Sequence, residues 1–184
     1  MKRFILAVTG ASGACYAKRL FDTLKECSEL HVVISERGVE LLKLELGLKT
    51  SYFSGDNVTL YKNSKINACI ASGSFYTDGM IIVPASMGTI GRIASGTSIT
   101  MVERAADVIL KEKRKLIIVP RETPFSTIHL KNLLALDQAG AHILPASPGF
   151  YSGQKTFEDL VDFVVARILD QLNIEQDLMD PYQG

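Results

Sequence analysis

A turn of small residues, Gly10-Ala11-Ser12-Gly13, separates an apolar run that ends at Thr9 from a helical pattern. The backbone N–H groups in the first turn of a helix point outward, and the helix dipole favours an anion at that end. Glycine lets the backbone approach a ligand closely and adopt a positive φ. The turn is therefore a candidate phosphate-binding loop.

Four more polar segments follow apolar runs in the same way. In chain order they are Ser35-Glu36-Arg37, Ser86-Met87-Gly88-Thr89, Arg121-Glu122-Thr123-Pro124, and the group Pro145, Pro148, Phe150 and Tyr151. The carboxyl ends of parallel strands share one edge of a sheet, and ligands bind beyond that edge. We therefore expect the five segments to form one site that is rich in hydroxyls and backbone donors.

The type of ligand follows from what the first turn lacks. A dinucleotide site requires the spacing GxGxxG and an acidic residue after the second strand, which holds a ribose. Here the turn reads GASG and the second run ends at Ser35. A single phosphate held by hydroxyls and amides fits better and points to FMN, with another phosphorylated metabolite as the alternative.

Short apolar runs alternate with amphipathic stretches of helix length. The predicted strands are Phe4–Thr9, Leu30–Ser35, Met80–Pro84, Leu116–Pro120 and His142–Pro145, with an edge strand near Val58–Tyr61. The predicted helices are Gly13–Glu26, Glu36–Leu46, Thr89–Ser95, Met101–Lys113, Thr127–Ala139 and Phe157–Leu172. This order predicts an α/β fold, a three-layer αβα sandwich with a parallel, right-handed sheet of Rossmann-like or flavodoxin-like type. We expect one domain over residues 1–184, in which residues 173–184 form a C-terminal tail.

The charge and cysteine content of the chain exclude several classes of protein. Its 20 basic residues balance 20 acidic ones, which argues against nucleic-acid binding and against a polybasic membrane surface. No apolar run is long enough for a transmembrane helix. Cys15, Cys27 and Cys69 show neither a CxxC motif nor metal-ligand spacing, so we expect no metal site and buried, reduced thiols in a cytoplasmic protein.

Each candidate residue also has a plainer structural interpretation. Ser12 and Ser86 are typical helix N-caps, and the cap is the favoured role for Ser12 taken alone. Arg121 is suited to a surface ion pair with Glu122 or a helix carboxylate. The remaining alternatives are a solvated helix face for Glu45, a solvated stripe for Arg104 and Lys111, and an apolar corner filled by Tyr151.

Six motifs, taken together, resemble one protein family. They are VTGASGA at Val8–Ala14, SGSF at Ser72–Phe75, PASMGTI at Pro84–Ile90, ERAADVILKEKRKL at Glu103–Leu116, PRETP at Pro120–Pro124 and PGFY at Pro148–Tyr151. With these motifs the chain resembles the flavin prenyltransferases (UbiX-like proteins), once described as aromatic-acid decarboxylase subunits. The resemblance extends from Lys2 to about Leu172.

The resemblance implies an activity, a cofactor and partners. Members join a dimethylallyl group from dimethylallyl phosphate to N5 and C6 of reduced FMN, without a metal ion. The prenylated FMN then serves a separate decarboxylase, often one in ubiquinone biosynthesis or aromatic-acid breakdown. The family also implies a homododecamer with a Rossmann-like fold.

The resemblance further implies roles for individual residues. The FMN-binding positions are Gly10, Ala11, Ser12, Ser35, Ser86, Met87, Gly88, Thr89 and Arg121. The prenyl-phosphate positions are Tyr151 and Arg167, together with Arg104 and Lys111 from across a subunit boundary. Ser12, Glu45 and Glu122 are the implied catalytic residues, which handle the substrate and move protons. An aromatic tail residue closes over the phosphate in some members, and Tyr182 stands near that place.

Two other functions stay open. An FMN-dependent cysteine decarboxylase shares the fold, but it usually carries an Asn-containing motif after a strand, and the five strand-end segments of this chain hold no asparagine. A non-catalytic FMN carrier needs one phosphate site rather than two. Incubation with dimethylallyl phosphate under reducing conditions distinguishes the three functions.

Overall fold

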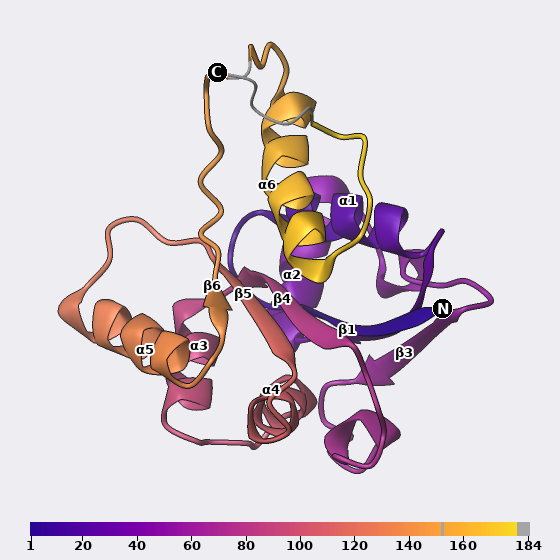
Figure 1. Cartoon of the computed structure of the whole chain (residues 1–184), viewed down its shortest axis with the longest axis vertical. Helices are drawn as coiled ribbons and strands as arrows, with labels where there is room; N and C mark the ends of the chain where they lie inside the picture. The colour runs from indigo at the N-terminus through magenta and orange to yellow at the C-terminus, as the bar shows by residue number, and fades with distance from the viewer. Residues whose placement is uncertain (152, 180–184) are drawn as a thin grey trace.

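The computed structural model describes residues 1–151 and 153–179, and Figure 1 shows their course. Tyr182, for which the resemblance implies a closing role, lies outside the described residues. Six parallel strands form one sheet in the order β3-β2-β1-β4-β5-β6. They are β1 (Lys2–Val8), β2 (Ser28–Ile34), β3 (Val58–Lys62), β4 (Gly79–Ala85), β5 (Lys115–Pro120) and β6 (His142–Ile143). This is the strand order of a Rossmann fold.

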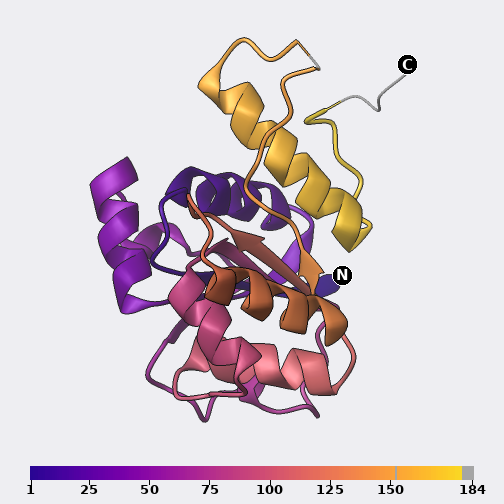
Figure 2. The same ribbon diagram turned by 90° about the vertical axis from the view of Figure 1, so that its left-hand side faces the viewer.

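All six predicted helices are confirmed, and two of them have the predicted bounds. They are α1 (Ala14–Leu24), α2 (Glu36–Leu46), α3 (Met87–Ala94), α4 (Met101–Lys111), α5 (Thr127–Gln138) and α6 (Phe157–Leu172). Two short 3-10 helices, η1 (Thr50–Tyr52) and η2 (Cys69–Ala71), flank β3 in the chain. Figure 2 shows α1, α2 and α6 over one face of the sheet and α3, α4 and α5 over the other. The predicted three-layer sandwich is therefore confirmed.

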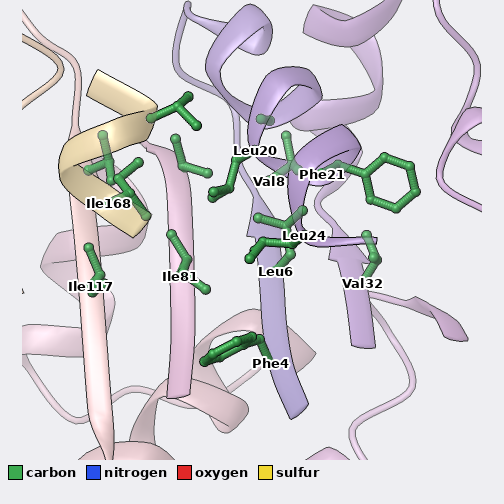
Figure 3. Packing of buried hydrophobic residues seen from close by; sticks show 14 of the residues in the cluster. Phe4, Leu6, Val8, Leu20, Phe21, Leu24, Val32, Ile81, Ile117 and Ile168 are labelled. Carbon is green, nitrogen blue, oxygen red and sulfur yellow. The ribbon is translucent and has the colours of Figure 1, made fainter. Parts of the chain in front are cut away.

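The two faces of the sheet carry separate apolar cores. On β1, Phe4, Leu6 and Val8 point to the face covered by α1 and α6, where Figure 3 shows them beside side chains of both helices. Ile5 and Ala7 point to the opposite face and pack with residues of α3, α4 and α5. A strand that alternates between two buried faces reads as a continuous apolar run, which explains the sequence pattern of Phe4–Val8.

The ends of α2 and α6 are set by local capping. The Ser35 side chain accepts a hydrogen bond from the backbone nitrogen of Gly38, and α2 ends at Gly47, which has φ 67°. At the start of α6, Thr156 and Asp159 form a capping box. Such caps satisfy backbone groups that the helix itself leaves unpaired, so these two boundaries were readable from the sequence.

The cysteines differ from expectation in their exposure. All three are free thiols, but Cys27 and Cys69 are exposed and Cys15 is half-buried. The prediction of buried thiols is therefore wrong for two of the three, because Cys27 follows the end of α1 and Cys69 begins η2, both outside the core. In the described part of the chain, no helix is long and apolar enough to cross a membrane. The same residues bring together no group of three or more His, Cys, Asp or Glu side chains suited to a metal ion.

Candidate active site

Thr9 links the two central segments at the carboxyl edge of the sheet. Its side chain is 1% exposed, donates to the carbonyl oxygen of Pro84 at 2.8 Å and accepts from the backbone nitrogen of Ser86 at 2.8 Å. The chain leaves β1 toward one face of the sheet and β4 toward the other, and ligands of open α/β sheets bind at such a switch point. Thr9 therefore holds the segments that follow β1 and β4 together as one unit where a ligand is expected.

The start of α2 packs directly against the end of β1. The backbone nitrogen of Ser35 donates to the carbonyl oxygen of Val8 at 2.9 Å. A Cβ atom on Gly38 would lie 2.7 Å from that same oxygen, and one on Gly10 would lie 2.4 Å from Cβ of Arg37. Glycine is required at both positions for this close approach, which brings Ser35 beside the GASG turn.

The first turn of α1 is capped by a carboxylate from another helix. Gly13 is the N-cap residue, with φ 114°, and no side chain within its own turn caps the helix. Instead, the Glu45 carboxylate accepts hydrogen bonds from the backbone nitrogens of Gly13, at 3.0 Å, and Ala14, at 2.8 Å. The interpretation of Ser12 as the N-cap is therefore wrong, because the chain enters the helix through a left-handed glycine one residue later. The amides of the candidate phosphate loop already hold an anion, which is Glu45.

The first turn of α3, by contrast, keeps backbone donors open. Ser86 is the N-cap residue: its side chain accepts from the backbone nitrogen of Thr89 at 3.4 Å and lies 3.0 Å from the Thr89 hydroxyl. The predicted capping role of Ser86 is confirmed. Within residues 1–151 and 153–179, the backbone nitrogens of Met87 and Gly88 have no hydrogen-bond acceptor. An anion placed beyond α3 would meet these two amides at the positive end of the helix dipole.

Arg121 joins the segment after β5 to the GASG turn. Its Nε donates to the carbonyl oxygen of Ser12 at 3.1 Å. In the part of the chain that the structure describes, Arg121 forms no ion pair with a carboxylate. The alternative interpretation of Arg121 as half of a surface ion pair is therefore wrong. The next residue, Glu122, is half-buried and accepts a hydrogen bond from the backbone nitrogen of Thr123 at 3.0 Å. Ser12 itself is exposed at the edge of the sheet.

Tyr151 and Arg167 gather around Phe163 on α6. The rings of Tyr151 and Phe163 meet edge to face, with centroids 5.9 Å apart. Phe163 and Arg167 lie one helical turn apart and line the same pocket of about 360 Å³, beside the edge strand β6. Arg167 donates from Nη1 to Asp170 at 2.8 Å. Tyr151 is 65% exposed, so it does not fill an apolar corner, and that alternative is wrong.

Arg104 and Lys111 both lie on α4, Arg104 near its start and Lys111 at its end. Arg104 donates to the carbonyl oxygen of Ala71 at 3.2 Å and to Asp107 at 2.8 Å. Lys111 pairs with Glu112 at 2.5 Å in the last turn before β5 begins, which places it at the amino end of the strands. One copy of the chain therefore gathers most of the predicted FMN residues at the carboxyl edge and sets Tyr151 against Phe163, one helical turn from Arg167. Arg104 and Lys111 make their contacts elsewhere, with Ala71, Asp107 and Glu112.

Three residues near the site were not singled out from the sequence. Thr9 and Gly38 are described above, and each had a signal: a hydroxyl at the end of an apolar run, and a glycine in the first turn of a helix. The third is Cys15, which lies in the first turn of α1. Burial raises the pKa of the Cys15 thiol, so it stays protonated at neutral pH.

Comparisons with known proteins place the chain in a family. A family model described as Flavoprotein matches residues 1–169. The flavin prenyltransferase UbiX of Halalkalibacterium halodurans is 47% identical over 95% of this chain and 90% of its own length. A dodecameric FMN-dependent UbiX-like decarboxylase from Escherichia coli O157:H7 superposes with a TM-score of 0.95 at 41% identity, over 99% of this chain and 100% of that one.

A second solved structure contains ligands. AnUbiX (PadA1), in complex with FMN and dimethylallyl pyrophosphate, superposes with a TM-score of 0.96 at 38% identity, over 100% of this chain and 98% of that one. The sequence similarity spans nearly the whole chain, and the fold agrees with it. The chain is a flavoprotein and belongs to the flavin prenyltransferase family.

Proposed function

We propose that the chain transfers a dimethylallyl group from dimethylallyl phosphate to N5 and C6 of reduced FMN. The observation that carries this proposal is the full-length similarity to a flavin prenyltransferase, together with a neighbour of TM-score 0.96 that holds FMN and a dimethylallyl pyrophosphate. The product, prenylated FMN, would serve a partner decarboxylase. Neither a cysteine decarboxylase nor a non-catalytic FMN carrier accounts for a bound prenyl donor in a relative this similar.

FMN is held at the carboxyl edge between β1, β2 and β4. The hydroxyls of Ser35, Ser86 and Thr89 and the open amides of Met87 and Gly88 are the donors suited to its phosphate. The turn Gly10-Ala11-Ser12 and the guanidinium of Arg121 line the space next to it. When bound, reduced FMN supplies the electron-rich nitrogen to which the prenyl carbon is joined.

The prenyl phosphate is held by Tyr151 and Arg167. Breaking its carbon–oxygen bond leaves a phosphate dianion, which the Arg167 guanidinium neutralises and the Tyr151 hydroxyl stabilises by a hydrogen bond. Preorganised donors of this kind are typically worth about 3–4 kcal/mol each. Arg104 and Lys111 add positive charge to the site of a neighbouring copy in a homododecamer, an assembly that the E. coli relative forms.

Proton transfer falls to Ser12, Glu45 and Glu122. Ser12 is exposed beside Arg121, and Glu122 follows Arg121 in the chain, so both lie at the edge where the flavin is held. Glu45 reaches the same edge from the last turn of α2. A proton-transfer group must come within hydrogen-bond reach of its target, and these three side chains are the candidates placed to do so.

One experiment tests the activity directly. The protein is incubated without oxygen with reduced FMN and dimethylallyl phosphate, and the flavin is then analysed by mass spectrometry. We expect a flavin heavier by one prenyl unit, and none in a sample that lacks the prenyl phosphate. A parallel sample with dimethylallyl pyrophosphate compares the two donors. An unchanged flavin mass with both donors contradicts the proposal.

The proposal also covers the setting of the enzyme. Residues 1–184 act as one flavoprotein domain, with 173–184 as its tail. Exposed free thiols such as Cys27 and Cys69 persist in a reducing compartment, which supports a cytoplasmic location. Cell fractionation tests the location, and native mass spectrometry tests the twelve-copy assembly.

A further inference from the structure

The guanidinium of Arg92 is fixed on two sides and free on the third. Arg92 lies on α3, where its Nε donates to the carboxylate of Glu103 and its Nη2 donates to the Thr89 hydroxyl at 3.4 Å. Its Nη1 has no hydrogen-bond partner in the part of the chain that is described. The side chain is therefore a preorganised donor with one unused N–H group next to a residue of the FMN-binding segment.

Glu103 anchors this arginine from the other helix. It lies on α4, is 1% exposed, and accepts hydrogen bonds from the backbone nitrogens of Ile99 at 3.0 Å and Thr100 at 2.9 Å. Burial raises the pKa of the Glu103 carboxyl, but the hydrogen bonds from Arg92 and the backbone outweigh burial, and the net pKa lies below its usual range. Glu103 is thus a fixed negative charge, and it leaves the arginine little freedom to move.

The free Nη1 lies beside the first turn of α3, next to Gly88. A Cβ atom built on Gly88 would be 3.5 Å from Nη1 and would meet no other side chain within 4 Å. Gly88 is the residue whose backbone nitrogen is open, together with that of Met87. The absence of a side chain at Gly88 therefore leaves the guanidinium beside the two unpaired amides.

At the first turn of α1, the anion position is already taken. The carboxylate of Glu45 occupies the amides of Gly13 and Ala14. At the start of α3, by contrast, the amides of Met87 and Gly88 are open in the described residues, and the guanidinium of Arg92 stands alongside them. The phosphate of a flavin nucleotide would meet amides, hydroxyls and a guanidinium together at α3.

We propose that Arg92 binds the phosphate of FMN and that Glu103 is the positioning residue that holds it in place. The proposal rests on the proposed function, because it assigns a further residue to the same FMN site. A guanidinium suits a phosphate because its N–H groups match the spacing of the phosphate oxygens. Arg92 is then the cation of the phosphate site, while Arg121 and Arg167 serve other parts of the pocket.

The test compares the dissociation constants of FMN and riboflavin, which differ by the phosphate alone. Arg92→Gln keeps an amide that can face Glu103 but removes the charge. We expect the dissociation constant of FMN, measured by flavin fluorescence, to rise about 10- to 100-fold, and that of riboflavin to stay unchanged. Arg19→Gln is the matched control, since Arg19 forms an ion pair with Asp162 on the surface of α1 and α6, and its FMN affinity should equal that of the unmodified protein.

A second variant tests the position of the charge. Because position 88 lies next to Nη1, Arg92→Gln combined with Gly88→Lys should recover most of the lost FMN affinity. Arg92→Lys keeps a positive charge beside buried Glu103, so this variant should fold even if Arg92→Gln does not. It should weaken FMN binding by a smaller factor than Arg92→Gln.

Three results would overturn the proposal. They are an unchanged FMN affinity in Arg92→Gln, an equal loss for FMN and riboflavin, and a raised KM for dimethylallyl phosphate with FMN affinity intact. Each can occur while the unmodified protein still prenylates FMN, so failure of this inference is distinct from failure of the proposed function.

Discussion

The Glu45 carboxylate accepts a hydrogen bond of 2.8 Å from the backbone nitrogen of Ala14, so the last turn of α2 caps the first turn of α1. The two residues are 31 positions apart in the chain. A carboxylate at this end of a helix is favoured by the helix dipole and pairs with amides that the helix leaves free. A residue proposed to move protons therefore also holds the glycine turn of the site in shape.

Replacing Glu45 separates these two roles. Glu45→Gln keeps an acceptor oxygen but removes the charge, so the free energy of unfolding should fall by only about 0.5–1 kcal/mol. Flavin should remain bound, while prenyl transfer is lost. Glu40→Gln is the control on the same helix, because Glu40 pairs with Arg37 at the surface. Turnover by Glu45→Gln at the rate of the control would contradict the catalytic role.

A second prediction concerns the link between β1 and β4. Thr9→Val removes a buried hydroxyl that both donates and accepts at 2.8 Å, which leaves the backbone nitrogen of Ser86 without its acceptor. The free energy of unfolding should fall by about 1–3 kcal/mol, and FMN should bind more weakly because the segment after β4 is released. Urea unfolding measures the first effect and flavin fluorescence the second. Thr9→Ser retains the hydroxyl and should stay close to the unmodified protein in both assays; equal losses in the Ser and Val variants would show that the two hydrogen bonds do not account for the effect.

Much of the fold could be predicted because its signals are local. The bounds of α2 and α6 follow from their capping residues, and the parallel sheet follows from apolar runs buried on both faces. The predicted length of the last strand, by contrast, was wrong. His142–Pro145 reads as a strand, but β6 ends at Ile143, and only single backbone hydrogen bonds from Leu144 and Ala146 to β5 continue beyond it.

The site was harder to predict because its contacts are distant in sequence. Ser86 lies in one of the family motifs, and Ser35 was singled out as a hydroxyl after the second apolar run; both lie at strand ends and also cap helices. No local pattern indicates that Glu45 rather than Ser12 caps α1, because this depends on the left-handed conformation of Gly13 and on the packing of α2. The contact between Arg92 and Glu103 joins two helices and has no periodic signal in the sequence.

His31 predicts a pH dependence of stability. It is 3% exposed in β2, with Nδ1 at 2.8 Å from the Tyr61 hydroxyl and Nε2 at 3.0 Å from the Glu29 carboxylate. Burial lowers the pKa of His31, although Glu29 partly opposes this shift. The unfolded chain therefore binds a proton at a pH where the folded protein does not, and stability falls as the pH drops below about 6.5.

The measurement is the free energy of unfolding in urea between pH 7.5 and pH 5. Glu29 stays charged over this range, because the hydrogen bond from Arg3 lowers its pKa. His31→Gln cannot take up the proton, so its stability should vary less with pH than that of the unmodified protein, even if it is lower overall. Parallel curves for the two proteins would assign the pH dependence to other groups.

Arg167 provides the last prediction, because its surroundings separate it from the FMN residues. It lines the pocket beside β6 together with Phe163, against which Tyr151 packs, whereas Ser35, Ser86 and Arg121 lie at the carboxyl edge. Arg167→Ala should therefore raise the KM for dimethylallyl phosphate at least about tenfold, the loss expected for a charge-assisted hydrogen bond, and leave the dissociation constant of FMN unchanged. Arg167→Lys should restore only part of the affinity, since an ammonium group lacks the paired donors of a guanidinium. Both constants are measured on the same preparation, and loss of flavin from Arg167→Ala during purification would show that the two anion sites are not separate.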